Sequence, residues 1–417
     1  MRVALDEWAL IAANRALKPR AVNLDGLIGL AEKRVVSITG IRRCGKSSVL
    51  MLLYRRLSEL GFKAVYVNLE DNRFRFPGAL DEVLKHSGSA EWLLLDEITS
   101  VPGWEGWLHR VNEMKAVKII VSSSLNKLSR FPPKPLRGRL SYSELFPLSF
   151  SEFLEFKGIK PEPFTLKGIG AIESALEEFL VFGGFPEIVL SDRKVELLQE
   201  YLNSIVALDI ASFSSSSFSL VSDFSELLLS ATIFSATKAE NSMKAMGHKV
   251  SKSTLLDLEK FFETAHLAFF VPVFSHKIKD KKLFPRKIYF GDSGFYYAAK
   301  GKRDFGRLYE TAVFLKLRRS LNPLEQIAYY KSKNGLEVDF VLRQGTTAKK
   351  LIQVAYELNE SIESREAKAL LEAAKEFGLK GTKKELLIIT KSMEGQEKSE
   401  GRTITYLPLW KWLLELH

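Results

Sequence analysis

The sequence predicts an α/β fold built on a parallel sheet, and two observations support this. Four apolar stretches that have the character of strands alternate with helical stretches, which is typical of a parallel sheet with helices on both faces. The first strand runs directly into a glycine-containing loop with the pattern G-x-x-x-x-G-K-[ST], and an apolar helix follows. We expect the strands at 34–39, 64–69, 91–96 and 118–122.

The residue types in this loop suit a bound phosphate. Gly40 and Gly45 allow backbone conformations that are closed to other residues, so consecutive N–H groups can turn toward an anion. The start of the following helix adds its positive dipole end. Lys46 can reach the β- and γ-phosphates of a nucleotide, and the Ser47 hydroxyl can hold Mg²⁺. We therefore expect ATP with Mg²⁺ on Gly40, Ile41, Arg42, Arg43, Cys44, Gly45, Lys46, Ser47 and Ser48.

Two acids close the third predicted strand and complete this hypothesis. Asp96 and Glu97 follow four apolar residues, so both would lie at the carboxyl edge of the sheet. Asp96 is predicted to join the Mg²⁺ shell, and Glu97 to orient and deprotonate the attacking water. The fourth strand ends in Ser122–Ser124, where a hydroxyl can sense the γ-phosphate. Arg137 or Arg139, in a proline-rich basic loop, is either an arginine finger or a solvated or nucleic-acid-contacting residue.

Composition sets the class of protein and its expected location. The chain has 417 residues, enough for two or three domains. A single cysteine, Cys44, excludes an internal disulfide framework and fits a reducing cytoplasm. The longest apolar run, Leu267–Phe274, is too short for a membrane span, and the N-terminus is unlike a secretory signal. We expect a cytoplasmic protein with no membrane contact. The net charge of +11 favours a nucleic-acid partner, although a heat-adapted basic surface gives the same balance.

Several motifs together resemble a known family. In order along the chain they are the phosphate loop, Asp96-Glu97 with a following Val-Pro-Gly-Trp, an Arg-Gly-Arg, and two further motifs at Phe146–Phe153 and Gly183–Pro186. This order resembles a family of archaeal and bacterial AAA-type P-loop ATPases. Members carry a C-terminal winged-helix segment and a restriction-endonuclease-like domain. Ser122 stands where the family usually has glycine.

The resemblance and the local patterns give a four-part division of the chain. Helical stretches from Ser149, broken by a Gly183-Gly184 turn, suit the small helical lid of such ATPases, and a serine-rich junction, Ser212–Ser219, follows. The expected parts are a P-loop ATPase core at 1–148, a lid at 149–211, a winged helix-turn-helix at 212–290 and a restriction-endonuclease-like domain at 291–417.

The third part is predicted to be a DNA-reading element. Helices at 224–235, 241–246 and 251–264 precede a hairpin formed by 267–274 and 283–290, whose tip is rich in lysine. Phosphate or groove contacts would come from the start of the third helix and from the wing. The alternative is a winged helix that only packs against protein. The candidate DNA-binding residues are Lys249, Lys252, Ser253, Lys279 and Lys281.

The terminal part resembles a nuclease in which one residue is changed. In active restriction-type nucleases a helix glutamate, a strand aspartate and a lysine on the next strand converge on Mg²⁺. The resemblance places Glu310 and Asp339 at the first two positions, but Ala355 stands where the lysine should be. We therefore expect a vestigial metal pair and no cleavage. The lysines that could substitute from neighbouring strands are Lys331, Lys333 and Lys350.

The function predicted from the sequence is ATP binding, with hydrolysis, coupled to a C-terminal DNA-binding unit. The catalytic residues would be Lys46 and Glu97, with Arg139 as the candidate finger. Three rival hypotheses stay open. They are an ATP-gated DNA-binding regulator with negligible turnover, an active Mg²⁺-dependent nuclease, and a protein-remodelling or self-assembling ATPase that acts on a protein partner or as an oligomer.

Overall fold

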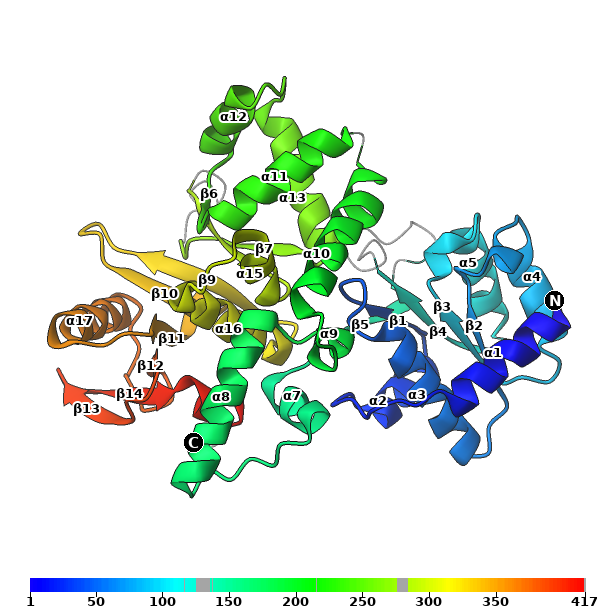
Figure 1. Cartoon of the computed structure of the whole chain (residues 1–417), viewed down its shortest axis with the longest axis horizontal. Coiled ribbons are helices and arrows are strands. Elements are labelled where there is room, and N and C mark those ends of the chain that lie inside the picture. The colour runs from blue at the N-terminus through cyan, green and yellow to red at the C-terminus, as the bar shows by residue number, and fades with distance from the viewer. Residues whose placement is uncertain (116, 125–135, 137, 215, 276–283, 416–417) are drawn as a thin grey trace. The chain divides into compact units, whose positions relative to one another are not determined.

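The computed structural model describes residues 1–115, 117–124, 136, 138–214, 216–275 and 284–415 (Figure 1). The chain separates into two compact units. Unit 1 is Met1–Leu148 with Thr264–His266, and unit 2 is Ser149–Glu263 with Leu267–His417. Within the described ranges, no helix has both the length and the apolar character needed to cross a bilayer.

Unit 1 contains a parallel sheet, which confirms the predicted fold class for this part of the chain (Figure 1). The strand order is β2-β3-β4-β1-β5, so the phosphate-loop strand β1 lies between β4 and β5. The first four strands match the sequence prediction to within one residue at each end, but β5 was not predicted. The strands are β1 (Val35–Thr39), β2 (Ala64–Asn68), β3 (Trp92–Asp96), β4 (Lys118–Ser123) and β5 (Leu140–Glu144).

The edge position of β5 explains why it was missed. Its sequence, Leu-Ser-Tyr-Ser-Glu, is polar at most positions, and only Leu140 is buried. A strand with one paired neighbour needs little apolar surface, so periodicity gives a weak signal there. It nevertheless pairs in parallel with β1 along its whole length, from Val35 opposite Leu140 to Thr39 opposite Glu144.

Helices cover both faces of this sheet. One face carries a buried cluster in which strand residues such as Val67, Leu95 and Val121 pack with α4 and α5. The alternating strand residues point the other way, toward α3, which contacts β2, β3 and β4. The helices are α1 (Arg2–Asn14), α2 (Leu24–Ala31), α3 (Lys46–Glu59), α4 (Ala79–His86) and α5 (Trp104–Met114), with short 3-10 turns at Asn72–Phe74 and Ile98–Ser100.

Unit 2 begins with a run of helices in the segment predicted to be helical. The first of them starts with a capping box, in which Ser149 and Glu152 each satisfy the other's backbone N–H. The elements are α7 (Phe150–Lys157), α8 (Leu166–Phe182), α9 (Pro186–Val189), α10 (Lys194–Ser204) and a π-helical segment, Ile205–Ala211.

The turn at Gly183-Gly184 is held by a carboxylate from a distant part of unit 2. Gly183 has φ 76°, and a Cβ there would lie 1.6 Å from Oδ1 of Asp292. Asp292 is 2 % exposed, and its carboxylate accepts hydrogen bonds from the backbone N–H of Gly184 (2.8 Å) and of Gly294 (2.9 Å). Only glycine fits at position 183, because any side chain would displace this carboxylate.

Burial raises the pKa of Asp292 from 3.8 to about 6, and this makes a testable pH dependence. A raised folded-state pKa contributes stability that is full below about pH 4 and is lost as the pH rises through 6. Relative to Asp292→Asn, the wild-type free energy of unfolding should therefore fall by about 2 kcal/mol from pH 4 to pH 7. Denaturant unfolding of both proteins across this range measures it, and parallel pH profiles would contradict the assignment.

The next segment forms three helices and a small sheet. Three helices form where three were predicted, but three boundaries were wrong: the first helix begins at Phe218 and ends at Ser230, and the second begins at Ala236. Ile233 and Phe234 form a short strand that the apolar pattern placed in the first helix. Ser251 caps the third helix as expected, since its Oγ accepts from the backbone N–H of Thr254. The elements are α11 (Phe218–Ser230), β6 (Ile233–Phe234), α12 (Ala236–Ala245), α13 (Lys252–Thr264), β7 (Ala268–Val271) and β8 (Arg286–Phe290), with the sheet order β6-β8-β7.

The apolar run Leu267–Phe274 is not one strand. β7 ends at Val271, and Val273 then forms a bridge with Tyr329 while the Phe274 N–H donates to the Tyr329 carbonyl (2.6 Å). Phe274 packs in the buried cluster of the terminal sheet. This single stretch therefore contributes to two sheets of unit 2.

The terminal sheet has six strands in the order β13-β14-β12-β11-β10-β9 (Figure 1). Strands β9, β10 and β11 are antiparallel neighbours, while β11, β12 and β14 run parallel. Strand β13 was not predicted from the sequence. The elements are α15 (Gly294–Lys300), α16 (Phe305–Ser320), β9 (Glu325–Lys331), β10 (Glu337–Gln344), β11 (Thr347–Ala355), α17 (Glu360–Glu376), β12 (Leu386–Thr390), β13 (Gly395–Ser399), β14 (Arg402–Pro408) and α18 (Leu409–Leu413).

Candidate nucleotide site and a second charged cluster

The predicted phosphate loop lies between β1 and α3 in unit 1. Gly45 precedes the first residue of α3 and has φ 105°, in the left-handed region that favours glycine. Gly40 is required for a different reason, because a Cβ there would lie 2.1 Å from the backbone oxygen of Leu145. Both glycines of the motif therefore have a structural reason in this chain.

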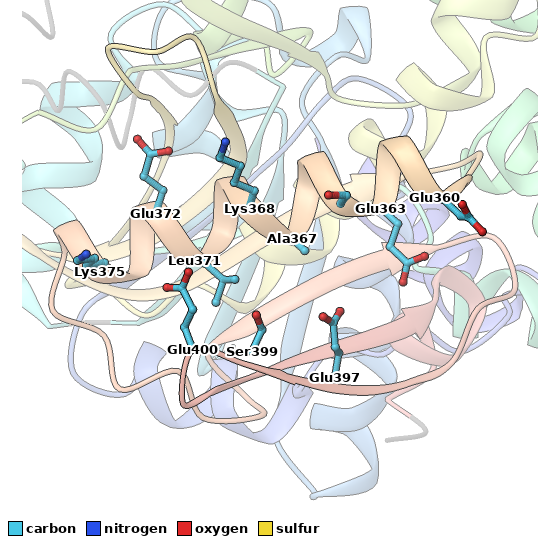
Figure 2. A pocket seen from close by; sticks show the side chains of 11 residues that line it. Glu360, Glu363, Ala367, Lys368, Leu371, Glu372, Lys375, Glu397, Ser399 and Glu400 are labelled. Carbon is cyan, nitrogen blue, oxygen red and sulfur yellow. The ribbon is translucent and has the colours of Figure 1, made fainter.

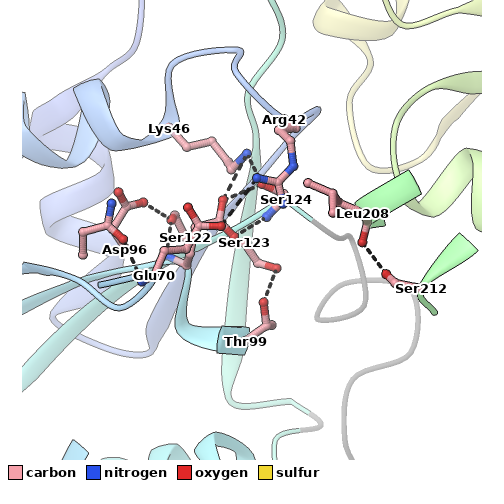
Figure 3. Close-up of polar contacts among 12 residues, drawn as sticks. Arg42, Lys46, Glu70, Asp96, Thr99, Ser122, Ser123, Ser124, Leu208 and Ser212 are labelled. Carbon is pink, nitrogen blue, oxygen red and sulfur yellow. Dashed lines mark hydrogen bonds and ion pairs between the residues drawn. The ribbon is translucent and has the colours of Figure 1, made fainter. Parts of the chain in front are cut away.

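The Lys46 side chain is buried and points back into the loop (Figure 3). Its Nζ donates to the backbone oxygens of Gly40 (3.0 Å) and Ile41 (3.3 Å) and to the Ser124 hydroxyl (3.0 Å). It also lies 3.6 Å from Oε1 of Glu97. The Lys46 ammonium therefore has polar partners in the loop, directly after β3 and directly after β4. A bound phosphate group would have to replace some of these partners.

Glu97 is held in an unusual backbone conformation directly after β3. Its φ of 51° and ψ of 53° are left-handed, and such strain in a residue other than glycine is common at functional sites. Ser124 donates to both carboxylate oxygens of Glu97, through its hydroxyl and through its N–H (2.9 Å). Burial opposes ionisation of Glu97, but Lys46 and the Ser124 hydrogen bonds outweigh it and lower the pKa. Glu97 is therefore an ionised carboxylate near neutral pH.

Asp96 lies deeper and is fully buried. Its carboxylate accepts from Ser122 (Figure 3). It also accepts from the Tyr66 hydroxyl (3.1 Å) and from Ser47. Burial and the neighbouring charge of Glu97 raise its pKa. The hydrogen bond with Ser47 places the two predicted Mg²⁺ ligands side by side, and a hydroxyl with a carboxylate is the oxygen-donor set that Mg²⁺ takes. The residues present therefore fit this ion.

The other predicted loop residues have separate roles. Arg42 pairs with Glu70 (3.5 Å). Cys44 is buried against the Leu145 carbonyl. Burial outweighs the charges of Lys46 and Arg20 and raises the pKa of the Cys44 thiol, which disfavours a reactive thiolate. Arg139, a candidate finger, pairs with Glu113 (2.6 Å) at the exposed end of α5, and Arg137, the other candidate, lies outside the described residues.

Sequence reasoning missed Ser124 as the group that joins Lys46 to Glu97. The three consecutive serines at the end of a strand indicated a polar site, but the pattern did not show which serine makes which contact. The structure separates them: Ser122 bonds Asp96 and the Glu97 N–H, Ser123 lies near Thr99 (3.5 Å), and Ser124 contacts Lys46 and Glu97 (Figure 3).

Unit 2 holds a second cluster of charges, in a cavity of about 540 Å³. Glu310 of α16 and Asp339 of β10, the predicted vestigial metal pair, both line it. Between them lies the ammonium of Lys287 from β8, with Nζ 2.6 Å from Asp339 Oδ1 and 3.3 Å from Glu310 Oε2. No sequence pattern indicated a role for Lys287.

The lysines proposed to replace the residue lost at Ala355 do not do so. Lys331, Lys333 and Lys350 are absent from the residues that line this cavity. Lys331 pairs instead with Glu337 and is half exposed, while burial and the nearby Lys384 lower the pKa of Lys350.

The predicted DNA-binding residues lie on exposed surface where the structure describes them. Lys249 precedes α13, and Lys252 and Ser253 open it. Lys279 and Lys281 lie outside the described residues.

A larger cavity in unit 2, of about 660 Å³, lies between α17 and the β13–β14 hairpin (Figure 2). Its lining mixes acids such as Glu363 and Glu400 with lysines such as Lys368 and Lys375. Glu397 accepts a hydrogen bond from the Tyr406 hydroxyl (2.8 Å). Most of these side chains are exposed, so they form a solvated surface groove.

Comparisons with known proteins agree with the P-loop geometry. Residues 32–154 match the model of an AAA domain. Residues 173–305 and 305–412 match two domains of unknown function, DUF8612 and DUF4143. Over 99% of its length the chain is 34% identical to an uncharacterized protein of Methanocaldococcus jannaschii, MJ1544, of which it covers 96%. It is 26% identical to an uncharacterized Haemophilus influenzae protein, over 89% of the chain and 93% of that protein.

Two solved structures show lower similarity. The Walker-type ATPase paby2304 of Pyrococcus abyssi aligns with a TM-score of 0.44 at 11% identity, over 69% of this chain and 99% of that one. AMPPCP-bound DnaA from Aquifex aeolicus aligns with a TM-score of 0.28 at 15% identity, over 57% and 91%.

Proposed function

Because this chain belongs to the family of the Methanocaldococcus jannaschii protein and its N-terminal part is an AAA-type P-loop domain, we propose that it binds and hydrolyses ATP. One observation carries the proposal. The Lys46 ammonium and the Glu97 carboxylate lie 3.6 Å apart and share Ser124 as a partner. A phosphate-binding cation and a proton acceptor therefore meet at one point above β3 and β4.

The proposed mechanism is an exchange of partners at Lys46. When ATP lies on the loop, its β- and γ-phosphates take the Lys46 ammonium, because a polyanion competes with a single carboxylate. Glu97 then loses its cationic partner and stays fixed by Ser124. It is placed to orient a water molecule and accept its proton. Mg²⁺, held by Ser47 and Asp96, would supply further neutralisation of the phosphate charge.

We further propose the four-part division at 1–148, 149–211, 212–290 and 291–417, with the third part a winged helix and the fourth a nuclease-like fold. The separation of the chain at Leu148 supports the first boundary. The order of α11, β6, α12, α13, β7 and β8 is that of three helices with a closing hairpin, which supports the winged-helix assignment.

DNA is the proposed partner of the second unit. The basic balance of the chain and the exposed Lys249, Lys252 and Ser253 at the start of α13 support this. A helix N-terminus with lysines is a common phosphate-contacting element. Hydrolysis at the loop would then change how the DNA-binding part engages its target.

Steady-state phosphate release, with and without single- or double-stranded DNA, tests the coupled function. We expect DNA to change the ATPase rate severalfold, and the double variant Lys249→Ala/Lys252→Ala to lose that change. Lys244→Ala is the matched control, because this exposed lysine of α12 pairs with Glu240 (2.8 Å) and should leave the response intact.

Other outcomes identify the rival functions. Tight ATP binding with no phosphate release would favour an ATP-gated regulator. Hydrolysis without any DNA binding at low salt would favour a protein-directed ATPase, since phosphate contacts are strongest at low ionic strength. The first result would contradict ATP hydrolysis but not DNA binding, and the second would contradict DNA binding but not ATP hydrolysis.

A further inference from the structure

The acid pair in unit 2 is already occupied by a cation that belongs to the chain. Lys287 lies on β8, is only 8 % exposed, and directs its Nζ to Asp339 Oδ1 and to Glu310 Oε2. Two carboxylate oxygens therefore lie within 3.3 Å of this ammonium, one from α16 and one from β10.

Other protein donors hold the same carboxylates. The second oxygen of Asp339 accepts from the Val354 N–H (2.9 Å). The Tyr289 hydroxyl donates to Glu310 Oε2 (2.9 Å), the oxygen that also faces Lys287. Gln353 accepts from the Asp339 N–H (3.0 Å) and donates to Glu366. Both oxygens of Asp339 and Oε2 of Glu310 are thus acceptors of hydrogen bonds within the fold.

A divalent ion does not fit beside this ammonium. Mg²⁺ binds carboxylate oxygens at about 2.1 Å and demands octahedral geometry, so it would have to stand next to Nζ, which is 2.6 Å from the same Asp339 oxygen. An ion on that oxygen would lie within about 4.7 Å of Nζ, and two cations this close in a buried site repel each other. Among the residues that the structure describes, no three His, Cys, Asp or Glu side chains are grouped as a metal site.

We propose that Lys287 is the resident cation of the Glu310–Asp339 pair and keeps divalent metal out of unit 2. This cluster therefore differs from the metal site of an active nuclease in more than the alanine at position 355. The site lacks the lysine on β11, and a different lysine, from β8, lies where the ion would be. The cluster then acts as a fixed cross-link between β8, α16 and β10.

Removing the ammonium should open a metal site. Nucleotide-free full-length Lys287→Ala should gain one Mn²⁺ site with at least about a hundredfold higher affinity than the wild type shows there, since the competing charge is gone. Mn²⁺ titration followed by electron paramagnetic resonance of the free ion measures it. The gained site should disappear in Lys287→Ala/Asp339→Asn. Lys411→Ala is the matched control and should gain no site, because that lysine of unit 2 pairs with Glu394, and neither residue lines this cavity.

Two results would overturn the proposal. One is an unchanged Mn²⁺ stoichiometry in a folded Lys287→Ala protein. The other is Mn²⁺ binding by the wild type that is lost in Asp339→Asn, which would show that metal and Lys287 coexist. This result requires no change at Lys287, so it tests the proposal even if the Lys287→Ala protein does not fold. A wild type whose Mn²⁺ binding equals that of Asp339→Asn supports the proposal.

Discussion

Lys46→Ala is expected to lower ATP turnover by about a hundredfold to a thousandfold, the range seen when one charge-stabilising donor is removed. The Lys46 ammonium is the group that would contact the β- and γ-phosphates. Its described contacts are backbone oxygens, the Ser124 hydroxyl and Glu97, so none of them could supply a replacement positive charge. ATP binding should weaken as well, because hydrogen bonds to charged groups contribute about 1.5–3 kcal/mol.

Two measurements check this prediction. Phosphate release gives turnover, and the rise in melting temperature on adding MgATP gives binding, since a ligand of the folded state stabilises it. Lys63→Ala is the control, because Lys63 is an exposed lysine of the same unit that contacts Ser89. Hydrolysis at the wild-type rate in Lys46→Ala would remove the phosphate loop from the proposed mechanism.

Glu97→Gln should separate binding from hydrolysis. The amide has the size of the carboxylate and can keep hydrogen bonds with Ser124, but it accepts a proton poorly. Hydrolysis should fall by about a hundredfold to ten-thousandfold, the usual contribution of a general base. ATP binding should persist or tighten, because Lys46 no longer has to leave an ionised partner 3.6 Å away.

Single-turnover hydrolysis and ATP affinity, measured on the same protein, test the separation. Glu70→Gln is a matched control, since Glu70 is another carboxylate near the loop but pairs with Arg42. Its turnover should stay close to that of the wild type. Normal turnover in Glu97→Gln would mean that another group orients the water.

The nucleotide site could be predicted from the sequence because its parts are local. A strand, six residues of loop and a helix fix where Lys46 and Ser47 lie, and the apolar run before Asp96 and Glu97 fixes the edge of the sheet. The parallel sheet follows from the same alternation. Elements with a weak local pattern could not be predicted. They include β5, which lies at a sheet edge, and β6, which has only two residues.

The site residues that could not be predicted are those whose contacts lie far apart along the sequence. Ser124 lies 78 positions from Lys46, and Lys287 lies 52 from Asp339. No spacing rule joins such pairs, because the fold alone brings them together. The substitutes proposed for Ala355 came from strands near it in sequence, whereas the lysine that reaches the acids comes from β8.

The path of the chain after β7 has a practical consequence for anyone who dissects this protein. Phe274 leaves the small sheet to pack against Phe377 in the terminal core, with tilted rings whose centroids are 4.5 Å apart. Lys287 and Tyr289 reach back to α16 and β10, and Asp292 holds the turn at Gly184. A fragment cut at residue 290 would lose partners on both sides of the cut. Unit 2 should therefore be expressed whole, and truncation products that start or end inside it are expected to be insoluble.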